Sequence, residues 1–60
     1  MTELEQVLMK RDNMSLAEVR QLISDARKDF DAHPDNYIDA DQFMEEWFGL
    51  EPDYIFDVLL

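Results

Sequence analysis

Oxygen-bearing side chains recur at short intervals between residues 29 and 41, in the segment DFDAHPDNYIDAD. Oxygen ligands at such intervals are what a hard cation such as Ca²⁺ needs when a single loop wraps around it. The candidate ligands, in chain order, are Asp31, Asp35, Tyr37, Asp39 and, directly after the segment, Gln42. Calcium binding is therefore one interpretation of this segment.

The segment resembles the loop of an EF-hand, with three departures. The EF-hand frame reads D-x-D-x-D-G-x-I-x-x-x-E, and residues 31–42 follow it with Ile38 at the hydrophobic position. His33 replaces an oxygen ligand, Asn36 replaces the turn glycine, and Gln42 replaces the final glutamate, which removes the bidentate carboxylate and its charge. The alternative is an acidic helix–loop–helix whose aspartates serve as helix caps and turn formers.

No set of side chains in this sequence has the pattern of a catalytic site. The single histidine, His33, stands in a polar loop, where we expect it to be solvated, and there is no cysteine. No grouping of a nucleophile, a base and an orienting residue is recognisable. We therefore expect a protein that is not an enzyme and that needs no cofactor, Ca²⁺ being the one alternative.

Length and composition bound the fold. Sixty residues predict one small domain, 1–60, with a modest core. Without cysteine there is no disulfide, so stability must come from helix packing, self-association or a bound ligand. We see neither a signal peptide nor an apolar run long enough to cross a bilayer, and we expect the protein in the cytoplasm.

The net negative charge belongs to one half of the chain. The formal net charge is −10, yet residues 1–28 hold five acids and five bases, whereas residues 29–60 hold ten acids and no Lys or Arg. Such a field repels nucleic acid and anionic lipid, and it attracts basic protein surfaces. We therefore expect a protein partner with a basic surface. The alternative is a solvated face that serves solubility.

Capping patterns and periodicity predict two helices in the first half. Thr2 and Ser15 each begin an S/T-x-x-E capping box, ahead of helices over about residues 3–11 and 16–31. Apolar residues at spacings of three and four give the second helix a buried face: Leu16, Val19, Ile23, Ala26 and Phe30.

The second half predicts a third helix and a short fourth one. Asp39 is the expected cap of the third helix, with Ile38 packing on Phe43 as a hydrophobic staple. Gly49 is placed to end that helix, and Pro52 to begin the last. No strand pattern is present. The predicted fold is all-α, a small bundle of three main helices plus a short C-terminal helix or turn.

Two candidate binding surfaces fall in the second half. One is acidic and comprises Asp39, Asp41, Glu45, Glu46, Glu51, Asp53 and Asp57. The other is aromatic and comprises Trp47, Phe48, Tyr54 and Phe56. Phe56 and Leu60 fall on different faces from the inward residues of the last helix, so we expect that end to be partly exposed. The apolar residues of this half fit either the core or an open groove with an acidic rim: Phe43, Trp47, Phe48, Tyr54 and Ile55. A basic protein or a second copy of the chain would cover such a groove.

Both ends of the chain carry longer patterns, LMKRDNMSLAEVRQLISDAR and EEWFGLEPDYIFDVLL. In these the chain resembles small acidic proteins encoded by bacteriophages, prophages and plasmids, which share an L-M-x-R-D-G-x-S/T start and a W/F-G-L-E-P-D-Y finish. Asn13 stands here in place of the glycine. The resemblance brings no activity with it. It implies a bacterial or phage context, in which small acidic proteins often act by binding host proteins.

The leading hypothesis is a non-enzymatic binding protein of a mobile element. Its acidic half would occupy a basic surface of a host protein, including one built for nucleic acid, and so act as an inhibitor or a DNA mimic. The alternatives are a single degenerate cation-binding helix–loop–helix and a structural homodimer.

Overall fold

Across residues 1–59 the fold consists of four α-helices, with α2 as its long axis. The computed structural model describes residues 1–59; Leu60, and the expectation about it, lie outside the described residues. The helices are α1 (Glu3–Arg11), α2 (Leu16–Ala32), α3 (Ala40–Phe48) and α4 (Ile55–Leu59), with 3₁₀ turns η1 (Pro34–Asn36) and η2 (Pro52–Tyr54). Residues 1–59 contain no strand, so the all-α prediction is confirmed.

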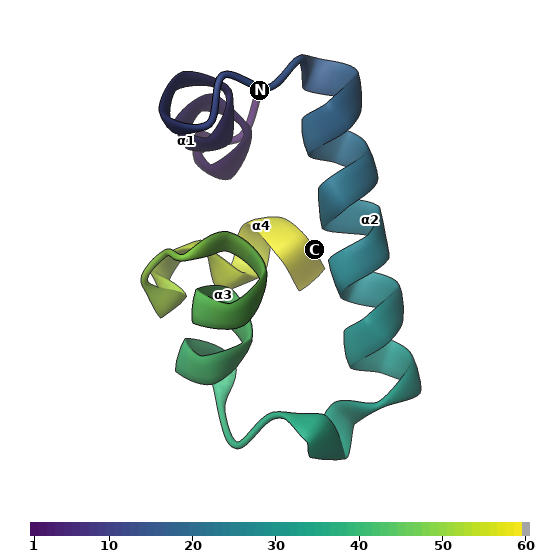
Figure 1. The fold of residues 1–60 in the computed structure, drawn as a ribbon. Helices are drawn as coiled ribbons and strands as arrows, with labels where there is room; N and C mark the ends of the chain where they lie inside the picture. The colour runs from purple at the N-terminus through teal and green to yellow at the C-terminus, as the bar shows by residue number, and fades with distance from the viewer. Residues whose placement is uncertain (60) are drawn as a thin grey trace.

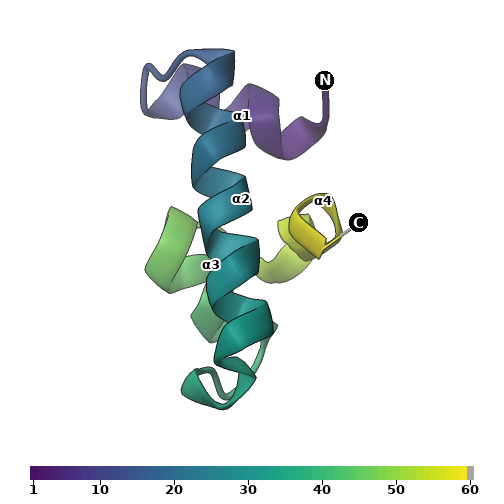
Figure 2. The same cartoon turned by 90° about the vertical axis from the view of Figure 1, so that its right-hand side faces the viewer.

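The three shorter helices lie to one side of α2 (Figure 1). In that view α1 lies beside the start of α2, α3 lies beside its end, and α4 lies between them in height. Turned by 90°, α3 and α4 flank the axis of α2 on opposite sides (Figure 2). None of the helices in residues 1–59 has the length and apolar character needed to cross a membrane.

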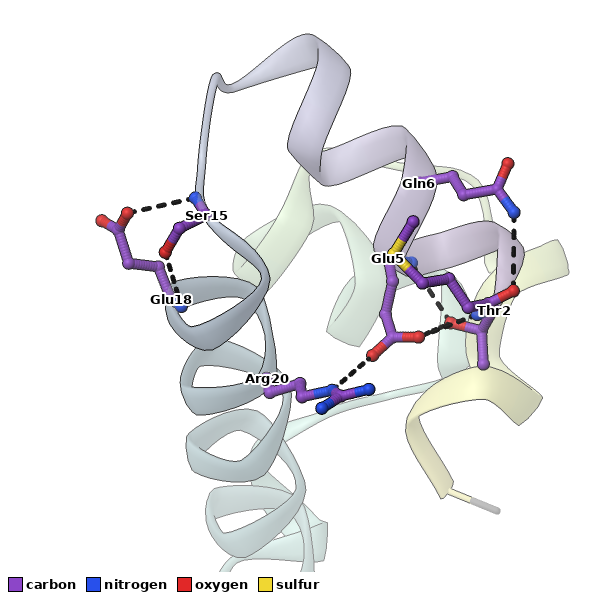
Figure 3. Close-up of polar contacts among 7 residues, drawn as sticks. Thr2, Glu5, Gln6, Ser15, Glu18 and Arg20 are labelled. Atoms are coloured by element: carbon purple, nitrogen blue, oxygen red, sulfur yellow. Dashed lines mark hydrogen bonds and ion pairs between the residues drawn. The ribbon is translucent and has the colours of Figure 1, made fainter.

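Capping boxes begin the first two helices, as the sequence predicts (Figure 3). Thr2 accepts a hydrogen bond from the Glu5 amide at 3.2 Å, and the Glu5 carboxylate accepts one from the Thr2 amide at 2.8 Å. Ser15 and Glu18 repeat the exchange at 3.2 and 3.1 Å. Between the helices Asn13 has φ 54°, a left-handed conformation that asparagine tolerates better than most residues.

The core is built from all four helices. Its fully or nearly fully buried members are Leu4, Leu8, Val19, Ala26, Phe43, Met44, Phe48 and Val58. Phe43 is the largest fully buried side chain, and three aromatic rings contact it edge-to-face: Phe30 and Tyr37 at centroid distances of 5.1 Å and Phe48 at 6.4 Å. Such pairs add to the stabilisation from buried area alone.

The ends of α3 form as predicted, but the hydrophobic staple does not. Asp39 Oδ1 accepts from the Gln42 amide at 3.0 Å, and Gly49 ends the helix with φ 65°. The predicted packing of Ile38 on Phe43 is wrong, because Ile38 is 90% exposed. Tyr37 has extended backbone angles, and successive side chains of an extended chain point to opposite sides. Tyr37 therefore reaches Phe43, and Ile38 points away.

Among the described residues, three hydrogen bonds link α1 to the end of α3 and to α4. The Arg11 guanidinium donates to two backbone oxygens at the end of α3. One belongs to Phe48, the last residue of the helix, and the other, at 3.1 Å, to Gly49, which follows it. The Leu4 amide, in the first turn of α1, donates to Asp57 Oδ2 of α4 at 3.2 Å. Unpaired carbonyls at a helix end favour a cation, and unpaired amides at a helix start favour a carboxylate.

Glu5 is the one buried charged residue in the part of the chain that the structure describes, at 8% exposure. Besides the Thr2 amide it accepts from Arg20 Nε of α2 at 3.1 Å. The hydrogen bond from the Thr2 amide, followed by that from Arg20, lowers the pKa of Glu5 below its ordinary value. The ionised carboxylate thus links α1 to α2.

Removing the Arg11 guanidinium should loosen the link between α1 and α3. We expect Arg11→Met to lower the free energy of unfolding by about 1 kcal/mol, because the hydrogen bonds to a charged donor are lost at a partly exposed site. Urea unfolding followed by circular dichroism measures this. Lys10→Met removes the same charge from the same helix end, so an equal loss in that variant would show that only the charge matters.

Acid should weaken the fold partly through Glu5. Because its pKa is lowered in the folded state, its contribution is present above the unfolded value of about 4.3 and is lost as the pH falls through the folded value. Glu5→Gln removes this titration, so we expect a shallower fall of melting temperature with pH below about 5. Identical slopes in wild type and Glu5→Gln would contradict the prediction.

Candidate acidic binding surface

Helix α3 places three of the predicted acids on its solvent side. Phe43, Met44 and Phe48 are buried, whereas Asp41, Glu45 and Glu46 are exposed. With 3.6 residues per turn, the buried residues occupy one side of α3, and the three acids fall on the part of the circumference left to solvent. We call Asp41, Glu45 and Glu46 the α3 acidic face.

The α3 acidic face is not neutralised within the described part of the chain. The ion pairs there are Arg11–Asp12, Arg20–Glu5 and Arg27–Asp31, and none of them involves an acid between residues 39 and 57. Asp41 and Glu45 are like charges four residues apart, which destabilises a helix by about 0.2–0.5 kcal/mol. Glu45 and Glu46 also lie in the last turn, where the helix dipole disfavours anions.

The other acids predicted for this surface have different positions. Glu51 and Asp53 are exposed around η2 and extend the acidic character beyond α3. Asp39 is exposed but caps α3. Asp57 is half-buried, and its carboxylate is engaged by the Leu4 amide. Five of the seven predicted acids are therefore exposed and neither cap a helix nor bond to another helix. The other two, Asp39 and Asp57, also stabilise the fold.

Most of the predicted aromatic surface is not available to a partner. Phe48, predicted as a binding residue, is only 3% exposed and belongs to the core, so its side chain is not open to a partner in this structure. Phe48 is buried because it lies on the side of α3 that faces the core, together with Phe43 and Met44. Trp47 and Tyr54 are half-buried, and Phe56 is 67% exposed on α4. Of the four aromatics, Phe56 alone presents most of its side chain to solvent.

Tyr37 has a structural role that the sequence did not indicate. Its hydroxyl donates to Asp29 of α2 and accepts from Trp47 Nε1 of α3 at 2.7 Å, and its ring stacks on Phe30. The hydrogen bond to Asp29, followed by burial, raises the pKa of Tyr37. An aromatic residue directly after a proline turn was the only signal available. The contacts fix the connection between α2 and α3.

The predicted cation ligands do not converge. Asp31 pairs with Arg27 at 3.8 Å, and Asp39 Oδ1 accepts from the Gln42 amide. Gln42 Oε1 accepts from the Ile38 amide at 2.8 Å, and Asp35 lies exposed in η1. Within residues 1–59 no three His, Asp or Glu side chains are grouped so as to hold a metal ion. The aspartates act here as cap and ion-pair partner.

Comparisons of this chain with protein-family models, with curated proteins and with solved structures found no match. The acidic surface must therefore be interpreted from its own geometry and charge.

Calcium should not stabilise this protein more than magnesium does. Two of the predicted ligands already accept hydrogen bonds from backbone amides, and calcium would have to displace them. The measurement is the melting temperature with millimolar chloride salts of each cation, compared between wild type and Asp31→Ala. A larger rise with calcium that disappears in Asp31→Ala would instead support the EF-hand interpretation.

Proposed function

We propose that this chain is a non-enzymatic binding protein whose acidic half occupies a basic surface of another protein. The observation that carries the proposal is the α3 acidic face, three exposed carboxylates without an intramolecular counter-ion in residues 1–59. Two of its features, the like-charge pair and the acids at the helix end, lower helix stability. Basic side chains of a partner would relieve both.

The charge distribution favours a basic partner over other classes. Residues 29–60 hold ten acids and no Lys or Arg, so nucleic acid and anionic lipid are repelled by this half. A protein that itself binds nucleic acid is the best match, because its surface is built to receive closely spaced negative charges. Occupying that surface would inhibit nucleic-acid binding by mimicry of its phosphates.

The resemblance to small acidic proteins of phages, prophages and plasmids supports a host protein as the target, in the cytoplasm of a bacterial cell. Asn13 is consistent with that resemblance, since it takes the left-handed conformation at the position where those proteins carry glycine. The scaffold is a small bundle of three main helices with α4 as a short addition.

The test is capture of partners from nuclease-treated bacterial lysate on the tagged chain, with washes at low and high salt. We expect a nucleic-acid-handling protein that is retained at low salt and released at high salt, because the contacts are electrostatic. The variant Asp41→Asn/Glu45→Gln/Glu46→Gln should capture much less of it, since the α3 acidic face is neutralised.

A matched control removes the same number of charges from the first half. Glu3→Gln/Glu18→Gln/Asp25→Asn neutralises three exposed acids there, and glutamine can still serve at the capping position of Glu18. This control should capture the partner as the wild type does. Equal losses in both triple variants would mean that net charge alone is recognised, and retention at high salt would contradict an electrostatic interface.

A further inference from the structure

Ile38 is the most exposed large hydrophobic side chain among the described residues, at 90%. Burying an isoleucine side chain stabilises a folded protein by about 1.5–3 kcal/mol, and the exposed Ile38 does not contribute this stabilisation. The staple position next to α3 would normally bury it, but Tyr37 makes the contact with Phe43 instead. Ile38 therefore contributes little to the fold.

The connection between α2 and α3 holds Ile38 in a fixed position. Its amide donates to Gln42 Oε1, and the preceding residue, Tyr37, is held by Asp29, Trp47 and the ring of Phe43. The following residue caps α3. A side chain presented on a fixed backbone loses little conformational entropy when a partner covers it.

The position of Ile38 is continuous with the α3 acidic face. Gln42 Nε2 donates to Glu46 Oε1 at 3.3 Å, so one side chain bridges the Ile38 backbone and that face. The nearest acids in sequence, Asp35, Asp39 and Asp41, are all exposed. An apolar centre with a charged rim is the arrangement of a protein interface, and here the rim has one sign.

We propose that Ile38 is the apolar anchor of the interface, entering an apolar socket framed by lysine or arginine side chains on a protein partner. This inference rests on the proposed function and adds to it. A purely phosphate-like mimic would need only basic side chains opposite, whereas Ile38 requires an apolar socket among them. The complex then depends on shape as well as charge.

The test uses a random dodecapeptide library displayed on phage and selected on the immobilised wild-type chain at low salt. We expect the enriched peptides to contain both basic and apolar residues. Their synthetic versions should bind Ile38→Ser about tenfold more weakly than wild type or Ile38→Leu. Since Ile38 is exposed, all three proteins should melt alike.

Phe56→Ser tests the competing anchor, because Phe56, one of the predicted partner-binding aromatics, is also a large exposed apolar side chain but lies on α4. With Ile38 as the anchor, Ile38→Ser should weaken binding more than Phe56→Ser does. Basic peptides that bind wild type and Ile38→Ser equally, or that bind only Phe56→Ser more weakly, would contradict Ile38 as the anchor. Neither result would contradict the proposed acidic binding surface. A selection that enriches no basic peptides would overturn the proposed function together with the anchor.

Discussion

The separation of charge along the chain constrains the polar contacts that link α1 to the end of α3 and to α4. Residues 29–60 contain no Lys or Arg, so a cation for the carbonyl end of α3 has to come from the first half, and Arg11 supplies it. The amides at the start of α1 receive a carboxylate from the second half, that of Asp57. Each half thus provides the charged group that completes a helix end of the other, and the α3 acidic face is left over for solvent or a partner.

Features set by neighbouring residues could be predicted from the sequence. The capping boxes at Thr2 and Ser15 form as expected, α2 ends within one residue of its predicted end, and Gly49 takes the left-handed conformation that stops α3. Each follows from the hydrogen-bonding groups or steric freedom of a few consecutive residues. The exposed acids of α3 were predictable for the same reason, since the helical period fixes which residues face outward.

Features that depend on the path of the chain could not be predicted in this way. Ile38 and Tyr37 both suit contact with Phe43, and the extended backbone at Tyr37 decides between them. The burial of Phe48 depends on which side of α3 meets α2, and the loop aspartates look alike as ligands or caps until their partners are placed. The charge distribution predicts a partner with a basic surface, but no pattern in this sequence identifies a particular protein.

The hydrogen bond between Leu4 and Asp57 spans 53 residues and ties the start of α1 to α4. Helix α1 has nine residues, too few for a stable isolated helix in water, so it depends on packing against α2 and on the contacts at its ends, including that of Asp57. Local opening of α4 therefore exposes the start of α1 as well, and amide hydrogens in both should exchange with solvent together. A ligand that takes the Asp57 carboxylate competes with α1 for it, which couples occupancy of that residue to the order of a helix at the other end of the sequence.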